Sequence, residues 1–175
     1  MKKATFGGGC FWCTEAMFQQ LKGVEKVVSG YCGGDKVDPT YQEVCTGETG
    51  HAEVVELTYD PEVISFEELL RVHMGSHDPT TLNQQGADVG TQYRSVIFYR
   101  DEEEEEIARQ VLTEYEDTTG NRATTEIEPF EVFYSAEDMH QNYYNDHTQA
   151  GYCEAVIAPK LRKFRDTYRH LFAGE

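Results

Sequence analysis

The chain has 175 residues, enough to bury one continuous core, and we predict a single domain over residues 1–175. Its 32 acidic against 15 basic residues argue against a nucleic-acid-binding protein, because phosphate binding needs clustered Lys and Arg. No apolar run approaches the ~20 residues of a membrane span, and none follows Lys2 and Lys3 as in a signal peptide, so we expect a cytoplasmic protein that does not bind membranes.

The formal charge of −17 is interpreted either as a surface that favours solubility or as an adaptation to high salt. The two interpretations differ in what salt should do to the melting temperature. A melting temperature that does not respond to molar salt would exclude the second.

Hydrophobic periodicity and punctuation by Gly and Pro divide the chain into alternating strands and helices. The predicted strands cover 4–6, 24–31, 53–59, 95–99 and 125–134, and the predicted helices cover 10–22, 65–72, 101–115, 135–143 and 159–171. Ser65 and Glu68 have the spacing of a capping box, and Pro159 suits a first helical turn. Pro129 is expected to break the strand in which it lies.

Residues 76–93 are rich in Asp, Gly, Thr, Asn and Gln and are predicted to form a long functional loop. The order of the elements predicts an α+β fold, a two-layer α/β sandwich with a mixed sheet. It would have a ferredoxin-like core, additional helices and a long C-terminal segment.

Cys10 follows three glycines at the point where a predicted strand passes into a predicted helix. Glycines permit positive φ angles and the close approach of another molecule to the backbone. At a helix N-terminus the sulfur would meet free N–H groups and the positive end of the helix dipole, which favour the reactive thiolate. Cys10 is therefore the candidate nucleophile.

Phe11 and Trp12 follow Cys10 directly, and two adjacent large aromatic residues at a helix start cannot both face a core easily. They could form an apolar wall that holds a methyl or thioether group beside the sulfur. The alternative for Trp12 is ordinary core packing.

The residues Gly-Cys-Phe-Trp-Cys-Thr-Glu-Ala at 9–16 resemble the opening motif of the A-type methionine sulfoxide reductases. The family's other sequence blocks are matched in order at 30–34, 39–47, 49–53, 77–80, 86–95, 140–143 and 152–153. The resemblance thus spans nearly the whole chain.

This resemblance implies that the Cys10 thiolate attacks the sulfur of the S epimer of free or protein-bound methionine sulfoxide, leaving a sulfenic acid. Glu53 matches the family's acid, whose pKa would be raised by burial. Tyr41 and Tyr93 match its two donors to the sulfoxide oxygen, and Asp88 matches an acidic residue of the same pocket. Phe11 and Trp12 match the pocket for the substrate methyl group.

A second thiol must convert the sulfenic acid into a disulfide, which the resemblance implies is reduced by thioredoxin or a small dithiol. Cys153 matches the family's C-terminal recycling position and is preferred slightly over Cys13, which lies on the same helical face as Cys10 and could also act as a relay. The role of Cys32 stays open, and Cys45 is expected to be a buried structural thiol. The family also implies a monomer with no metal and no organic cofactor.

Two other classes of protein stay open. A zinc module could use Cys10, Cys13 and a histidine, although the spacing of Cys32 and Cys45 supplies no second close pair. A Cys–His acyl-transfer enzyme could use His51 or His140 as its base.

Overall fold

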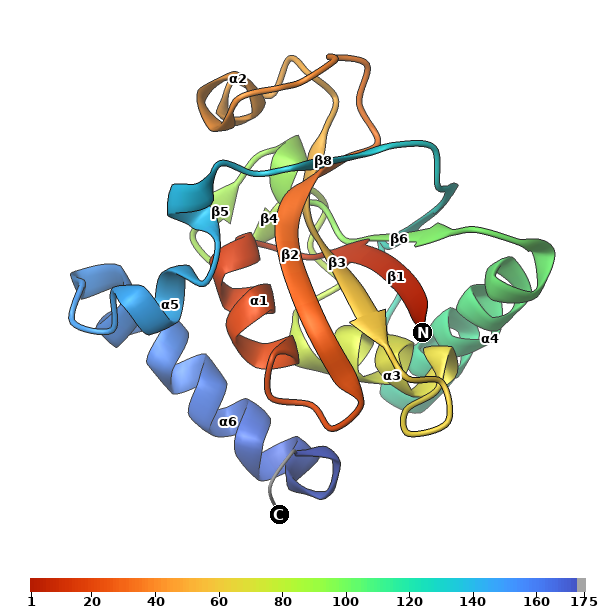
Figure 1. Cartoon of the computed structure of the whole chain (residues 1–175). Helices are drawn as coiled ribbons and strands as arrows, with labels where there is room; N and C mark the ends of the chain where they lie inside the picture. The colour runs from red at the N-terminus through yellow and green to blue at the C-terminus, as the bar shows by residue number, and fades with distance from the viewer. Residues whose placement is uncertain (173–175) are drawn as a thin grey trace.

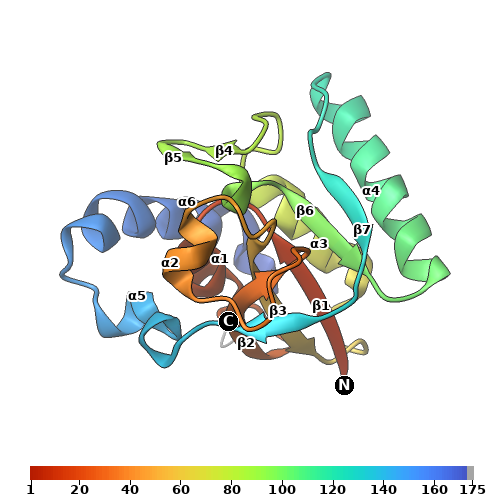
Figure 2. The same cartoon turned by 90° about the horizontal axis from the view of Figure 1, so that it is seen from above.

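A computed structural model describes residues 1–172 of the chain (Figures 1 and 2). Its strands are β1 Lys2–Gly7, β2 Val24–Cys32, β3 Ala52–Tyr59, β4 Gln84–Gln85, β5 Asp88–Val89, β6 Val96–Tyr99, β7 Glu126–Pro129 and β8 Phe133–Ser135. Its α-helices are α1 Phe11–Phe18, α2 Tyr41–Cys45, α3 Phe66–Ser76, α4 Glu102–Thr119, α5 Tyr143–Asp146 and α6 Ala158–Tyr168. Short 3-10 turns lie at Thr91–Tyr93, Asp138–His140 and Arg169–Leu171, and a π-helical turn at Cys153–Ile157 precedes α6.

The main sheet has the order β7-β6-β1-β3-β2-β8, in which β6 and β7 are parallel and the other neighbours are antiparallel. The four central strands and the helices α1 and α3 form two interleaved β-α-β units, which is the ferredoxin-like arrangement. The predicted α+β class, mixed sheet and ferredoxin-like core are therefore confirmed. In Figure 1, α1 and α6 are seen to the left of β2, and α3 and α4 are seen to the right of it.

Alternation along β3 sends its residues to two different cores. Val55, Leu57 and Tyr59 face the main cluster under α1 and α3. Ala52 and Val54 face a second cluster with Cys32, Val96 and Phe98. Because side chains alternate in a strand, Glu53 points the same way as Val55, towards the start of α1.

The sheet is curled, because its two edge strands are nearly consecutive in the chain. Only residues 130–132 separate β7 from β8, which occupy opposite edges. Four peptide steps span at most about 14 Å, so the edges of the sheet must approach each other. Phe130 and Phe133 pack on the second cluster in this turn, and the Arg100 guanidinium lies 4.0 Å from the centroid of the Phe130 ring.

Helix ends are fixed by local capping. Ser65 accepts from the backbone N–H of Glu68, whose carboxylate accepts from Ser65 N–H, so the predicted capping box is confirmed. Thr40 and Glu43 form a second capping box, which begins the short helix α2 that the sequence analysis did not predict. Gly120 ends α4 in the left-handed conformation, with φ of 73°.

Three local predictions are wrong. The predicted strand at 125–134 is interrupted after Pro129 as expected, but its two parts are separate strands on opposite edges of the curled sheet and not one broken strand. The helix at 135–143 is a 3-10 turn without a side-chain cap, followed by the four-residue helix α5. Cys45 is exposed at the end of α2 and is not a buried structural thiol.

The loop at 76–93 is irregular as predicted, apart from the hairpin β4–β5 and the turn at Thr91–Tyr93. Within residues 1–172, none of the helices combines the length and apolar character required to cross a bilayer.

Candidate active site around Cys10

The glycine turn between β1 and α1 is held from three sides. Gly9 has φ of 86°, and its N–H donates to the carbonyl of Tyr93 at 3.1 Å. A Cβ on Gly8 would lie 2.6 Å from the ring of His77, and one on Gly9 would lie 2.7 Å from the side chain of Gln85. The turn therefore needs glycine at these positions, and the loop at 76–93 fixes the approach to Cys10.

Cys10 is the N-cap of α1, as predicted, and only 7% of its surface is exposed. Its carbonyl accepts from the N–H groups of Cys13 and Thr14, at 3.1 and 3.4 Å. The hydrogen bond with the Cys13 thiol, burial and the nearby Glu53 carboxyl raise the pKa of the Cys10 thiol well above its ordinary value, against a small opposing effect of the Trp12 N–H. The hydrogen bond with Cys13 and burial therefore oppose the predicted thiolate and outweigh the helix N-terminus in their effect on the Cys10 pKa.

Glu53 lies beneath the start of α1 with 1% of its surface exposed. Its Oε1 accepts from the Phe11 N–H at 3.2 Å, whereas its Oε2 is buried and has no partner among the described residues. Burial raises the pKa of Glu53 to about 8, with smaller contributions from Asp88 and Cys13 and an opposing one from the Phe11 N–H. The carboxyl is therefore protonated at neutral pH, and Oε2 can carry a proton that has no acceptor within the protein.

Tyr41 begins α2 and Tyr93 ends the 3-10 turn of the 76–93 loop. Burial raises the pKa of both phenols, and the Glu53 carboxyl raises each of them further. Both side chains therefore lie in the electrostatic neighbourhood of Glu53 and stay protonated donors.

Asp88 lies on β5, and its Oδ2 accepts from the Tyr152 hydroxyl at 3.1 Å. The same hydroxyl is 3.9 Å from the sulfur of Cys13. Asp88 and Cys13 are thus bridged by a residue of the C-terminal segment.

Phe11 is fully buried, with Tyr31, Tyr41 and His140 around its ring. Trp12 is half-buried, and its ring is stacked on Tyr143 with centroids 3.8 Å apart and planes 8° apart. Its indole N–H donates to Nδ1 of His140 at 3.2 Å. Phe11 thus packs in the core, and the orientation of Trp12 is set by residues that lie about 130 positions further along the chain.

The C-terminal segment is attached to α1 by polar contacts that the sequence analysis missed. Glu15 is 2% exposed, and its Oε2 accepts from the Asn142 N–H at 3.0 Å. Gln141 exchanges two hydrogen bonds with the backbone of Ser29 on β2. Glu15 on a helix gave no signal of its own, although its place beside the Cys10 motif could have suggested a partner.

The cysteines fall into two groups, and all five are free thiols. Cys13 is 4% exposed and shares a hydrogen bond with Cys10, and its charge raises the pKa of the fully buried Cys153 after the effect of burial. Cys10, Cys13 and Cys153 belong to one core cluster, and the hydroxyl of Tyr152, the residue before Cys153, lies 3.9 Å from the Cys13 sulfur. Cys32 lies in the second core cluster, where burial raises its pKa to about 12, and Cys45 is exposed beside Tyr41.

The histidines of the alternative hypotheses have other roles in this structure. His51 accepts from the Gly34 N–H at its Nδ1, and its Nε2 lies 2.7 Å from the Lys36 carbonyl, so both ring nitrogens contact backbone. His140 holds the Trp12 indole. Across residues 1–172, no three His, Cys, Asp or Glu side chains are grouped as metal ligands would be.

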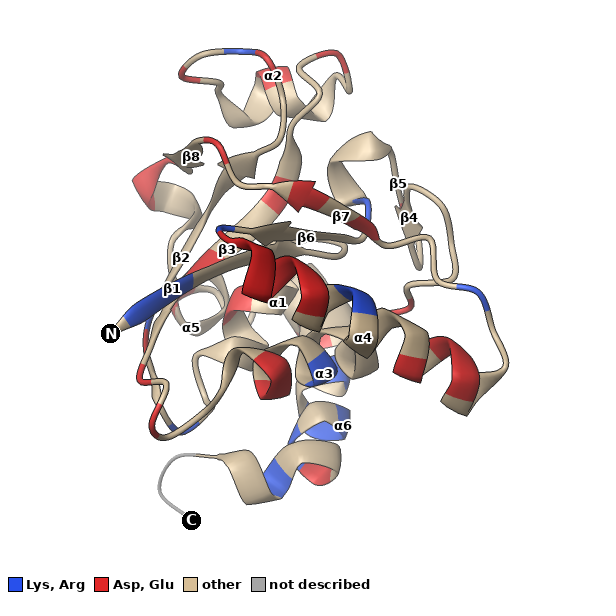
Figure 3. Ribbon diagram, turned by 90° about the vertical axis from the view of Figure 1, so that its right-hand side faces the viewer, with Lys and Arg blue, Asp and Glu red and all other residues tan. Residues whose placement is uncertain are grey.

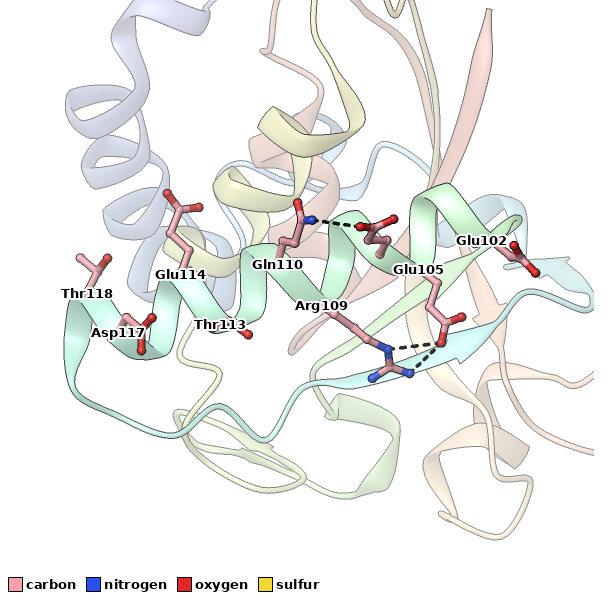
Figure 4. A pocket seen from close by; sticks show the side chains of 9 residues that line it. Glu102, Glu105, Arg109, Gln110, Thr113, Glu114, Asp117 and Thr118 are labelled. Carbon is pink, nitrogen blue, oxygen red and sulfur yellow. Dashed lines mark hydrogen bonds and ion pairs between the residues drawn. The ribbon is translucent and has the colours of Figure 1, made fainter.

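A hollow of about 780 Å³ lies away from this centre, along α4 (Figure 4). Its lining comes entirely from that helix and contains no cysteine, and Arg109 in it pairs with Glu105 at 2.7 Å. It is an open groove beside an acidic helix, without a reactive group.

The fold and the site together define a thiol-based oxidoreductase with a cysteine at a helix N-terminus and a protonated buried carboxyl. The sequence comparisons give the family. Residues 2–171 match the family model described as peptide methionine sulfoxide reductase, and the chain belongs to this family, as the resemblance predicted.

Two relatives show how close the similarity is, and both are called peptide methionine sulfoxide reductase MsrA. The protein of Sulfolobus acidocaldarius is 54% identical over 168 residues, which cover 96% of each chain. The protein of Polynucleobacter asymbioticus is 52% identical over 177 residues, which cover 100% of this chain and 93% of the relative.

Solved structures agree with this assignment. Methionine sulfoxide reductase A of Corynebacterium diphtheriae has a TM-score of 0.82 at 38% identity, covering 88% of this chain and 78% of the other. Mxr1 of Saccharomyces cerevisiae in reduced form has a TM-score of 0.80 at 36% identity, covering 87% and 88%. Mxr1 in complex with Trx2 has a TM-score of 0.57 at 28% identity, covering 81% and 84%. The chain is therefore an MsrA-type methionine sulfoxide reductase.

Proposed function

We propose that the chain reduces the S epimer of free and protein-bound methionine sulfoxide, with Cys10 as the nucleophile. In the first step the Cys10 sulfur attacks the sulfoxide sulfur. The S–O bond of the substrate breaks, and its oxygen, together with the thiol proton, ends on Cys10 as a sulfenic acid. The thioether leaves as methionine, so two electrons pass from Cys10 to the substrate. The observation that carries the proposal is the unpartnered, protonated Glu53 carboxyl oxygen beneath Cys10.

Glu53 supplies the proton that the sulfoxide oxygen needs as its S–O bond weakens. Its Oε1 is fixed by the Phe11 N–H, which leaves Oε2 to carry the proton towards the substrate. Tyr41 and Tyr93, kept protonated by burial and by Glu53, donate to the same oxygen. Asp88 orders the pocket through its hydrogen bond with Tyr152.

The preference for one epimer follows because the site fixes three directions around the sulfoxide sulfur. The methyl group lies against Phe11 and Trp12, the oxygen faces Glu53, and the sulfur faces Cys10. With three directions assigned, only one configuration at sulfur sends the rest of the methionine towards the protein surface. Tyr143 lies on the face of Trp12 in the ligand-free protein.

Cys13 and Cys153 regenerate Cys10 in sequence. Cys13 attacks the sulfenic acid, which releases water and forms a Cys10–Cys13 disulfide. Cys153 then attacks Cys13, which frees Cys10 and leaves a Cys13–Cys153 disulfide. Support comes from the shared hydrogen bond of Cys10 with Cys13, and from Tyr152, which directly precedes Cys153 and whose hydroxyl lies 3.9 Å from the Cys13 sulfur. The relay thus uses both cysteines between which the sequence left the choice open.

The final disulfide is reduced by thioredoxin or a small dithiol, so the reaction uses no metal and no organic cofactor. The relative Mxr1 has been solved in complex with Trx2, which supports a protein reductant of this class. We further propose that the chain works as a single-domain monomer in the cytoplasm.

The test is turnover of the two purified epimers of methionine sulfoxide with dithiothreitol as reductant. We expect reduction of the S epimer alone, loss of activity in Cys10→Ser, and near-normal activity in the matched control Cys32→Ser. Turnover of neither epimer by the reduced protein, or equal turnover of both, would overturn the proposal. Peptide mapping of Cys153→Ser after one turnover should show Cys10 joined to Cys13; free Cys13 in that sample would rule out the relay.

A further inference from the structure

Helix α6 is a basic element in an acidic protein. Five of the chain's 15 Lys and Arg residues lie between residues 158 and 169, where Asp166 is the only acidic residue. The contrast with α4 is visible in Figure 3, where several segments of the α6 ribbon are blue and both ends of the α4 ribbon are red. A local positive field on a chain of charge −17 is a feature that overall solubility does not explain.

Two of the five basic side chains are used internally, since Arg165 donates to Gln20 at 2.9 Å and Arg169 pairs with Asp166 at 3.8 Å. Among the described residues, Lys160, Arg162 and Lys163 form no ion pair. Arg162 and Lys163 are exposed. A cavity of about 290 Å³ lies between α6 and the end of α3, and Lys160 and Lys163 line it opposite Asp78. The Asp78 carboxylate is bound instead by the N–H of Thr80, at 2.9 Å.

The basic helix begins close to Cys13 and Cys153, the two cysteines of the proposed recycling disulfide. The π-helical turn Cys153–Ile157 runs directly into α6, so Cys153 and Lys160 belong to one continuous helical element. The charge of Lys160 lowers the pKa of Cys13, after the effect of the hydrogen bond from Cys10 and against burial. The positive field therefore reaches the disulfide that the recycling steps leave.

The entrance beside Tyr41 has the opposite character. Glu137 accepts from the backbone N–H of Tyr41, and Lys36 at that end of the molecule is paired with Glu43 at 3.3 Å. Substrate and reductant must both reach this centre, and an acidic partner is attracted more strongly to α6 than to the surface beside Tyr41. The charge distribution thus favours the reductant, and not the substrate, as the partner of α6.

We infer that the exposed surface of α6 around Arg162 and Lys163, with Lys160 one turn before Lys163, is the docking surface for an acidic protein dithiol that reduces the recycling disulfide. The inference rests on the proposed function. Attraction between opposite charges raises the rate of encounter and orients the reductant's thiol towards Cys13 and Cys153.

The chemical step on this surface is a thiol–disulfide exchange. A thiolate of the partner attacks one sulfur of the Cys13–Cys153 disulfide, and a mixed disulfide forms as the other sulfur leaves with a proton. The partner's second thiol then attacks the mixed disulfide. Two electrons and two protons pass to the chain, and the partner ends as an intramolecular disulfide.

The test compares two reductants on a double charge reversal, Arg162→Glu with Lys163→Glu. The matched control, Lys2→Glu with Lys26→Glu, makes the same change of charge on two exposed lysines. They lie at the end of the sheet that is away from Cys10. The probes are a purified acidic bacterial thioredoxin, kept reduced by its reductase and NADPH, and dithiothreitol. Both are assayed with free methionine S-sulfoxide.

We expect the KM for thioredoxin to rise about tenfold in the α6 variant, with dithiothreitol-driven turnover unchanged and the control variant like the parent. Raising salt from about 50 to about 300 mM should raise the parent's KM for thioredoxin and affect the α6 variant less. An unchanged KM for thioredoxin in the α6 variant would overturn the inference. A changed KM for an acidic sulfoxide peptide under dithiothreitol would also overturn it, by assigning α6 to the substrate. Loss of dithiothreitol-driven activity in the parent protein would instead refute the proposed function.

Discussion

Replacing the buried Glu53 carboxyl by an amide, in Glu53→Gln, is expected to stabilise the fold at neutral pH and to slow the reduction of the sulfoxide. Burial raises the pKa of Glu53 from 4.5 to about 8, so the folded protein holds a proton that the unfolded chain has released at neutral pH. Because the folded protein must take up this proton at neutral pH, its free energy of unfolding is lower than that of a variant with a neutral side chain at position 53. The amide has no such penalty and still fits the site.

The magnitude follows from this pKa difference. Each pKa unit between the folded and the unfolded chain corresponds to about 1.4 kcal/mol of unfolding free energy. Because the folded-state pKa is the higher one, the penalty is absent below pH 4.5, grows as the pH rises, and is complete above about pH 8. Glu53→Gln should therefore be about 3 kcal/mol more stable than the parent at pH 7 and about 5 kcal/mol more stable above pH 8.

The assay is denaturant unfolding of the reduced protein at about pH 4.5, 7 and 8.5, with single-turnover reduction measured on the same samples. Glu128→Gln, an exposed carboxyl on β7, is the matched control and should show no gain at any of these pH values. The variant's rate of reduction should fall, because an amide donates a hydrogen bond but not a proton. A Glu53→Gln protein that is equally or less stable than the parent at pH 8.5 would refute the reasoning.

Three further substitutions or probes test other parts of the structure. Gly8→Ala should destabilise the protein by about 1–3 kcal/mol and reduce turnover, because the added Cβ meets the His77 ring. Gly151→Ala, whose Cβ has no atom within 4 Å, should change neither stability nor turnover. Equal Tm values for the two variants would contradict this. Alkylation of Cys10 by iodoacetamide in the ligand-free protein should be slow at neutral pH and keep rising above pH 9, since its pKa is raised, and a rate that levels off near pH 7 would show a resting thiolate. Cys32→Ser should lower the free energy of unfolding by about 1–3 kcal/mol, by burying a hydroxyl in the second core cluster, without changing dithiothreitol-driven turnover.

Much of the fold could be predicted from local patterns. The alternation in residues 53–59 predicted the strand β3, whereas the burial of Glu53 was expected only from the family resemblance. The capping box at Ser65 gave the start of α3 for an equally local reason. The strand at 125–134 was wrong because the curl of the sheet, which sends β7 and β8 to opposite edges, is a property of the whole sheet.

The candidate site divides in the same way. The helix N-cap position of Cys10 followed from the glycine run, but its raised pKa depends on burial and on Glu53, which the local sequence does not contain. The orientation of Trp12 depends on Tyr143 and His140, whose approach is a tertiary contact. The relay of thiols likewise required the C-terminal segment to be placed on α1.

The central claim, that Cys10 performs the reduction, is tested most directly by a single turnover without any reductant. The fully reduced protein is mixed with one equivalent of methionine S-sulfoxide, and methionine and thiols are counted in the same sample. We predict about one methionine per chain and the loss of two thiols, with none formed by Cys10→Ser. Methionine formed by Cys10→Ser at the parent's level would contradict the account.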